Sequence, residues 1–271
     1  METRKGYLIV IRHGARRDEV ERFVQDADPE LTPRAIEDGL DTGVELMKYM
    51  HKNGMLGEET KGFKFITSVM YRCLQTMQQV RKGMELYSHD NANELPFDWG
   101  KYISQKSTFV EEACTEKTEA KEIEPGFFEE VRYLADHVKL FDEMNEINPK
   151  ARQLFDYNGR DSKLAIKAWV KDSKVKKKLC ESFFANIVEQ MRADPQDDKY
   201  IIVAHNQNLN KLASYFGGKA HASVQYNSCS IVEVNLDSTQ RPPPVKVMIE
   251  NKRLTNREGE HVDKTTICKF K

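Results

Sequence analysis

Apolar residues along the chain fall into short continuous runs, and several of the segments between them show helical spacing. The runs at 7–11 and 200–204 are continuous and rich in β-branched residues, and polar segments bound both. Strands that are buried on both faces, as in a parallel sheet covered by helices, have this pattern. We therefore expect 7–11 and 200–204 to be central strands, with further strands at 63–67, 231–236, 245–249 and 265–270.

Helical periodicity appears in four segments between these strands. Thr32 and Pro33 suit a helix start, with threonine at the N-cap and proline at the first helical position, and the helix is expected to end at Asn53-Gly54. Ser68 can cap a second helix. The apolar positions of the four predicted helices are Ile36, Leu40, Val44 and Met47; Met70, Leu74, Met77, Val80 and Met84; Leu179, Phe183, Phe184, Ile187, Val188 and Met191; and the apolar residues of 208–216.

The order of these elements predicts an α/β fold in one domain. The chain has 271 residues, which suits a single domain covering 1–271. Between about 131 and 178 the helical pattern is interrupted by Asn148-Pro149 and Asn158-Gly159. We interpret this stretch as a helical cap insertion on top of the sheet.

The overall composition narrows the class of protein. Basic and acidic residues number 42 and 43, with a formal net charge of −1, so nothing points to nucleic acid or to a membrane surface. No apolar run approaches the roughly 18 residues that span a bilayer. Five scattered cysteines argue for reduced thiols, and isolated histidines suggest no metal site. We expect a cytoplasmic protein without a signal peptide.

Histidines and arginines follow the predicted strands at their carboxyl ends. Arg12 and His13 come directly after the first strand, with Arg16 close behind, and His205 follows the strand at 200–204. Arg72 lies just after a third junction between a strand and a helix. Ligands bind at this edge of open α/β sheets, and two histidines with several arginines would form an anion site there. Taken singly, the histidines can be structural and the arginines a surface cluster.

Three segments resemble the signature motifs of the histidine phosphatase superfamily. These segments are Arg12-His13-Gly14, the stretch 68–76 that contains Arg72, and Val203-Ala204-His205. They occur in the superfamily's order, and the resemblance covers about residues 6–236. The chain more narrowly resembles the phosphatase domains of the suppressor-of-T-cell-receptor-signalling proteins and of ecdysteroid-phosphate phosphatase. The segments that carry this narrower resemblance are 12–16, 124–129 and 202–205. Those proteins carry SH3 and ubiquitin-binding modules upstream, and we expect a free-standing catalytic domain here.

The resemblance implies a fold and a set of roles. The fold is a three-layer α/β/α arrangement with a mostly parallel central sheet and a helical insertion over its carboxyl edge. His13 is the implied nucleophile that takes the phosphoryl group, and Glu129 the implied proton donor to the leaving oxygen. The implied ligands of the phosphate oxygens are Arg12, Arg16, Arg72 and His205. Several neighbours compete with Glu129 for its role, namely Glu111, Glu112, Glu119, Glu122, Glu124 and Glu130.

These residue types suit that chemistry. Phosphoryl transfer asks a protein mainly to position the group and to neutralise charge on its equatorial oxygens, and the planar fork of arginine matches those oxygens. A neutral imidazole is a competent nucleophile near neutral pH, so we expect neither metal nor cofactor. Cys73 follows Arg72, but no arginine stands at the downstream spacing of a cysteine phosphatase loop. We interpret Cys73 as a packed thiol.

Three positions depart from the motifs. Asn206 follows the second histidine where many superfamily members have glycine, Glu130 stands where the narrower relatives have an aromatic residue, and Thr67 replaces a residue that is small in most members. Of these, Glu130 bears most directly on how the leaving group of the substrate would be bound, because it is next to Glu129. Three aromatic residues near these motifs would suit contact with a substrate ring such as that of phosphotyrosine, and they would equally suit packing in the hydrophobic core. They are Phe127, Phe128 and Tyr71.

The sequence thus predicts a metal-independent phosphomonoester hydrolase, histidine acid phosphatase-like or phosphoglycerate mutase-like, acting through a phosphohistidine. Its expected substrate is a small phosphomonoester or a phosphotyrosine-containing molecule. The alternatives are a phosphoglycerate mutase-type phosphotransferase and a catalytically weak scaffold or binding module of the same fold. The segment 124–129 and the long insertion favour the phosphatase. We expect no nucleic-acid or membrane partner, and leave a homodimer open.

Overall fold

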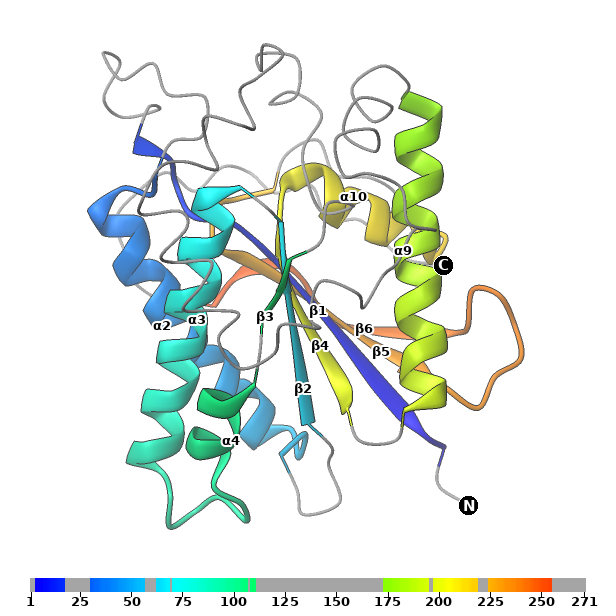
Figure 1. Cartoon of the computed structure of the whole chain (residues 1–271). Coiled ribbons are helices and arrows are strands. Elements are labelled where there is room, and N and C mark those ends of the chain that lie inside the picture. Colours follow the sequence, from blue (N-terminus) through cyan, green and yellow to red (C-terminus); the bar gives the residue numbers. More distant parts are fainter. Residues whose placement is uncertain are drawn as a thin grey trace.

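A mixed sheet runs through the middle of the computed structural model (Figure 1). The residues that the structure describes are 3–17, 30–56, 62–68, 70–106, 108–110, 173–194, 197–218 and 224–254. Within them the sheet has six strands in the order β3-β2-β4-β1-β5-β6. These are β1 (Lys5–Arg12), β2 (Gly62–Thr67), β3 (Thr108–Val110), β4 (Asp197–Ala204), β5 (Ser228–Asn235) and β6 (Val245–Arg253). The strand predicted at 265–270 lies outside the described residues.

The centre of the sheet is parallel, as predicted. β1 pairs with β4, β4 with β2, and β2 with β3, all in parallel, whereas β5 runs antiparallel to β1 and β6 antiparallel to β5. The register sets Ile11 opposite Val203 of β4 and opposite Cys229 of β5. The loop 236–244 joins β5 to β6, and it is shorter than the crossover that a parallel pairing of these strands would need.

Helices cover both faces of the sheet, which gives the predicted three layers. On one face lie α2 (Pro33–Lys52), α3 (Tyr71–Asp90) and α4 (Trp99–Gln105), and on the other lie α9 (Ser173–Ala193) and α10 (Asn206–Tyr215) (Figure 1). Alternate residues of β1 enter two separate cores. Ile9 and Ile11 pack with residues of α2 and α3, whereas Leu8 and Val10 pack with residues of α9 and α10. Because both faces are covered, the apolar run of β1 is continuous.

The start and end of α2 agree with the sequence, but its buried face does not. Thr32 caps the helix, its Oγ1 accepting from the Ala35 N–H at 3.1 Å. Of the four residues predicted to face the core, Met47 is buried and Ile36, Leu40 and Val44 are only partly so.

Glycines at the contact between α2 and α3 explain the rotated face. A Cβ added to Gly43 would lie 2.0 Å from the Val80 carbonyl oxygen, and one added to Gly83 would lie 2.0 Å from the Leu40 carbonyl oxygen. The two backbones therefore approach too closely for any side chain at either position. Helix α2 turns its small residues toward α3, and the apolar stripe of α2 is displaced from the centre of the interface.

The segment 88–107, where the sequence pattern predicts no regular element, contains α4. Asp98 caps this helix, with its Oδ1 accepting from the Lys101 N–H at 2.9 Å. Trp99 and Ile103 of α4 are buried in the core beside α3. The helix has seven residues, which is too short for its apolar positions to repeat, so the absence of a helix that the pattern predicts here is wrong.

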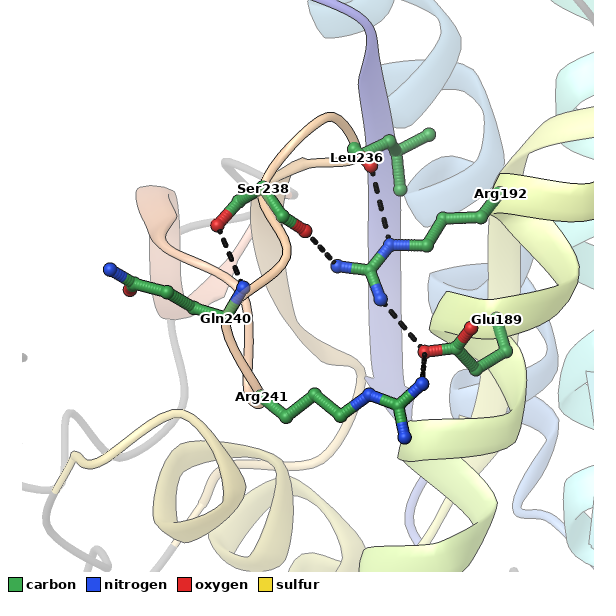
Figure 2. Close-up of polar contacts among 6 residues, drawn as sticks. All are labelled: Glu189, Arg192, Leu236, Ser238, Gln240 and Arg241. Atoms are coloured by element: carbon green, nitrogen blue, oxygen red, sulfur yellow. Dashed lines mark hydrogen bonds and ion pairs between the residues drawn. The ribbon is translucent and has the colours of Figure 1, made fainter.

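The carboxyl end of α9 is tied to the turn between β5 and β6 (Figure 2). Arg192 donates from Nε to the Leu236 carbonyl at 3.2 Å and from Nη2 to the Ser238 carbonyl. Glu189 lies between two guanidiniums, 2.7 Å from Arg192 Nη1 and 3.4 Å from Arg241 Nη2. These contacts fix α9 against the amino edge of the sheet, at the end opposite the carboxyl ends of β1 and β4.

Arg4 strengthens the same junction from the start of β1. Its guanidinium donates to the carbonyls of Met191, Arg192 and Asp194, at 2.6, 2.9 and 3.3 Å. The last carbonyls of a helix have no intrahelical donors, so Arg4 acts as a cap for α9.

The predicted insertion is described only at its end. Its residues 173–178 form the beginning of α9, and 131–172 lie outside the described residues. Among the described helices, α9 included, there is no segment of the length and apolarity that a membrane span requires.

Candidate active site

Adjacent parallel strands bring the two predicted histidines together at the carboxyl edge of the sheet. β1 and β4 stay in register as far as Arg12 and Ala204, and the His13 N–H continues the ladder by donating to the Ala204 carbonyl at 3.0 Å. His13 and His205 come directly after these strands. Both are buried, at 2% and 0% exposure, and their ring centroids lie 5.1 Å apart.

Arg72 enters the same place from the third junction. β2 pairs with the other edge of β4, and α3 begins a few residues beyond the end of β2. In the first turn of α3, the Arg72 side chain is fully buried. Its Nε–H donates to Nε2 of His13 at 3.4 Å, and its Nη2 lies 3.5 Å from Nδ1 of His205. A single guanidinium therefore contacts both histidines.

The backbone fixes the tautomer of His13. Nδ1 lies 2.7 Å from the Gly14 carbonyl oxygen, and because that oxygen can only accept, Nδ1 carries the ring hydrogen and Nε2 presents its lone pair. Burial lowers the pKa of His13 well below its usual 6.5, and the charges of Arg72, Arg12 and Arg16 lower it further. The hydrogen bond to Gly14 acts in the opposite direction and raises this pKa, but it does not offset the other effects. His13 is therefore neutral at neutral pH, the form that can act as a nucleophile.

Ser68 holds the second histidine. The Ser68 hydroxyl accepts from the Met70 N–H at 3.3 Å and lies 3.0 Å from Nε2 of His205. The sequence suggested Ser68 as the cap of α3, but the N-cap position is Met70, without a side-chain cap. The Sγ of Cys73 lies 3.6 Å from the same His205 nitrogen. Cys73 is buried, in agreement with its interpretation as a packed thiol.

The loop after β1 is held against α3 by one hydroxyl. Thr76 Oγ1 accepts from the Gly14 N–H at 3.1 Å and donates to the Arg72 carbonyl at 2.7 Å. A Cβ on Gly14 would lie 2.8 Å from the Cβ of Ala35. Gly14 is thus required by the close approach of Ala35 in the first turn of α2.

Arg12 and Arg16 both lie near His13, and each makes different contacts. Arg12 donates from Nη1 to the Val224 carbonyl, and its guanidinium carbon lies 3.8 Å from the centre of the Tyr226 ring. Arg16 forms an isolated antiparallel bridge with Leu31. Both arginines act on the pKa of His13. The structure therefore brings together Arg12, His13, Arg16, Arg72 and His205, whereas Glu129 lies outside the described residues.

The contacts that three residues make at this site were not predicted from the sequence. Thr76 could have been found, because it lies four residues after Arg72 on the same face of a helix. The contact of Ser68 with His205 follows from the parallel pairing of β2 with β4. Tyr226 carried no signal, since the sequence predicts only that a strand begins nearby.

The arrangement suits a tetrahedral oxyanion. The Arg72 guanidinium lies beside a neutral imidazole nitrogen in a buried place, where charge-assisted hydrogen bonds are strong, and Arg12 and Arg16 add positive charge nearby. Across the part of the chain that the structure describes, no three histidine, cysteine, aspartate or glutamate side chains are grouped as metal ligands.

The sequence matches no protein-family model and no curated relative. Solved structures do resemble the fold. Phosphoglycerate mutase from Bacillus anthracis is 13% identical with a TM-score of 0.50, over 93% of this chain and 95% of that one. A mycobacterial glucosyl-3-phosphoglycerate phosphatase is 15% identical with a TM-score of 0.46, over 92% and 99%. A phosphoserine phosphatase from Entamoeba histolytica is 14% identical with a TM-score of 0.45, over 91% and 97%.

The likeness to the Bacillus anthracis enzyme shows the fold of this chain. Its three layers and central parallel strands are those of the phosphoglycerate mutase fold. Many chemistries can share one fold, so the function depends on the residues at the carboxyl edge.

Proposed function

We propose that the chain is a phosphomonoester hydrolase of the histidine phosphatase superfamily, with a phosphohistidine intermediate on His13. The observation that carries the proposal is the state of His13. It is buried and neutral, its hydrogen is held on Nδ1 by the Gly14 carbonyl, and its Nε2 lies 3.4 Å from Arg72 Nε. A nucleophile needs such a free electron pair, and a phosphoryl group needs such a guanidinium.

In the proposed first step, the lone pair of His13 Nε2 attacks phosphorus and the bond from phosphorus to the leaving oxygen breaks. Arg72 exchanges its contact with Nε2 for contacts with the phosphoryl oxygens. The imidazole becomes positively charged when it is phosphorylated, and the Nδ1–H bond to Gly14 stabilises that charge. In the second step water attacks phosphorus and gives a proton to the carboxylate of the acid that protonated the leaving oxygen, the P–N bond breaks, and inorganic phosphate and neutral His13 are released.

His205 serves in this proposal as a second donor to the phosphoryl oxygens. If the Ser68 hydroxyl donates to Nε2, then Nδ1 carries the hydrogen and points toward Arg72 Nη2, 3.5 Å away. Two donors that face each other at this distance favour an anion between them. Arg12 and Arg16 add positive charge to the same place.

Glu129 is proposed as the acid that protonates the leaving oxygen. It lies in the segment 124–129, which supports the narrower assignment to the relatives of suppressor-of-T-cell-receptor-signalling proteins and ecdysteroid-phosphate phosphatase. A carboxyl group near a bound phosphate has a raised pKa, because the phosphate charge disfavours its ionised form. We extend the proposal to a cytoplasmic enzyme whose substrate is a small phosphomonoester or a phosphotyrosine-containing molecule.

A mutase is the second candidate, favoured by the resemblance in fold to a phosphoglycerate mutase. It would use the same phosphohistidine but return the phosphoryl group to a second hydroxyl rather than to water. Mutase activity that depends on 2,3-bisphosphoglycerate would replace the hydrolase proposal.

The experiment that tests the function measures hydrolysis of p-nitrophenyl phosphate in the presence of EDTA. We expect turnover by the wild type, none above background by His13→Ala, and wild-type turnover by the control His51→Ala. His51 is a partly buried histidine of α2 whose Nδ1 contacts the Tyr87 hydroxyl. Absence of turnover in the wild type on this ester and on a panel of phosphorylated metabolites and phosphopeptides would favour the scaffold alternative.

A further inference from the structure

The segment 224–227, just before β5, contacts the motif 12–14 at several points. The Val224 carbonyl accepts from Arg12 Nη1. The Asn227 N–H donates to the His13 carbonyl at 3.4 Å, from a residue whose φ is +54°. Between these two residues, the ring of Tyr226 faces the Arg12 guanidinium. The segment therefore forms a side of the site that no predicted motif supplies.

Tyr226 touches both functional groups of the motif. The guanidinium carbon of Arg12 lies 3.8 Å from the ring centroid, and the imidazole centroid of His13 lies 5.5 Å from it, with the two rings tilted by 48°. The Tyr226 side chain is partly buried. Such a separation between an arginine and an aromatic ring is well within the range of a cation–π contact.

Stacking affects how Arg12 can bind an anion. A guanidinium donates hydrogen bonds in its own plane, and the ring occupies a face, so the stack does not compete with the N–H groups. The Val224 carbonyl then fixes the rotation of the plane by accepting from one edge. Together the ring and the carbonyl orient the remaining edge of the guanidinium, which lowers the entropy that Arg12 loses when it binds an oxyanion.

We propose that Tyr226 is a positioning residue for phosphoryl binding, acting through Arg12 by means of its ring face. The proposal rests on the proposed function, because it takes Arg12 as a ligand of the phosphoryl oxygens. The ring face carries the effect on Arg12, since the ring contacts both Arg12 and His13. Phenylalanine should therefore replace tyrosine better than leucine, which is apolar but smaller and has no π face.

The experiment measures the affinity for inorganic vanadate by calorimetry, with kcat and KM for p-nitrophenyl phosphate beside it. Tyr226→Leu should weaken vanadate binding on the order of 3- to 30-fold, the range of a cation–π contact, while Tyr226→Phe recovers most of the affinity. The matched control is Tyr215→Leu in α10, where the tyrosine packs on Phe216 with centroids 4.7 Å apart. It should bind vanadate as the wild type does.

A double-mutant cycle separates positioning from a merely structural role. In an Arg12→Ala background, Tyr226→Leu should cause little further loss of vanadate affinity, because the residue acts through Arg12. An equal loss with and without Arg12, or an equal affinity of the leucine and wild-type proteins, would overturn the proposal. Melting temperatures of all variants show whether Tyr226→Leu simply unfolds the protein. If it does, Tyr226→Met replaces it as the variant without an aromatic ring, and its vanadate affinity is compared with that of Tyr226→Phe.

Failure of the proposed function looks different. If the wild type binds vanadate with the Tyr226 dependence described but forms no phosphoenzyme, the anion site and the role of Tyr226 stand and the hydrolase falls. If it forms the phosphoenzyme and the Tyr226 variants bind vanadate normally, only the positioning role falls. If it does not bind vanadate, both fall.

Discussion

The hydroxyl of Ser68 lies 3.0 Å from Nε2 of His205, and it accepts a hydrogen bond from the Met70 N–H. With that bond accepted, the hydroxyl hydrogen can be directed at His205 Nε2, which places the ring hydrogen of His205 on Nδ1. The contact thus links the end of β2 to the orientation of His205, the proposed second donor, which directly follows β4.

Ser68→Ala should lower kcat for p-nitrophenyl phosphate by roughly 3- to 10-fold, the effect of one lost hydrogen bond that orients a donor. The matched control is Ser104→Ala, which removes an exposed hydroxyl that donates to the Lys101 carbonyl at the end of α4. We expect the control to keep wild-type kcat. An unchanged kcat in Ser68→Ala would remove the hydroxyl from the proposed mechanism.

Arg72→Ala should reduce kcat on the order of 10²–10³-fold, as expected for one preorganised donor in a buried site. Inhibition by vanadate should weaken in parallel, because its oxygens occupy the positions of the transferring phosphoryl group. Arg34→Ala serves as the control, since Arg34 is half exposed on α2 and pairs with Asp38 at 3.6 Å. Vanadate inhibition that survives Arg72→Ala would exclude Arg72 from phosphoryl binding.

The lowered pKa of His13 predicts a dependence of stability on pH. The folded state keeps His13 neutral, whereas in the unfolded chain its pKa is close to the ordinary value. Below about pH 6.5 the unfolded state therefore binds more protons, and the free energy of unfolding falls as the pH falls, by up to about 1.4 kcal/mol per pH unit. Above about pH 7.5 His13 contributes no pH dependence.

Urea unfolding of the wild type and of His13→Ala measures this contribution. The difference between their free energies of unfolding should be constant at neutral and higher pH, and should shift in favour of the variant between about pH 6.5 and pH 5.5. A difference that stays constant over that interval, or shifts in favour of the wild type, would mean that folded His13 is not held neutral.

The sequence predicted the centre of this fold because burial on both faces of a strand leaves a continuous apolar run. The runs of β1 and β4 are such strands, and the residues that follow them, His13 and His205, necessarily meet when the strands are adjacent and parallel. Arg72 joins them because β2 lies on the other side of β4. Predicting that these three side chains lie together required only local sequence patterns and the rule that the carboxyl ends of parallel strands meet at one edge of the sheet.

Other features depend on contacts between distant segments. The rotated face of α2 is set by the approach of Gly43 and Gly83 to the opposite backbones, and helical periodicity contains no information on that approach. Tyr226 reaches Arg12 from a segment more than two hundred residues away, whose packing follows from the antiparallel pairing of β5 with β1. Short elements such as α4 offer too few repeats to be recognised.

Glu129→Gln should lose far more activity on an alkyl phosphate than on p-nitrophenyl phosphate, since an alkoxide needs a proton to leave and p-nitrophenolate hardly does. Rates for both esters are measured for this variant and for the controls Glu124→Gln and Glu130→Gln. The controls should show no dependence on the leaving group. A differential loss at Glu111, Glu112 or Glu124 would move the acid to that position, and its absence at every glutamate would direct attention to His205.

The most direct test of the account is the identity of the residue that carries the phosphoryl group during turnover. The enzyme is mixed with substrate, quenched at alkaline pH, digested and analysed by mass spectrometry. The stability of the phosphoryl linkage to acid and to base is measured on the same samples. We predict a phosphoryl group on His13, labile in acid and stable in base, that is lost in His13→Ala. A covalent phosphoryl group on another residue, such as Cys73 or His205, would contradict the account. The account would also be contradicted if His13→Ala turned over substrate at the wild-type rate without forming a phosphoenzyme.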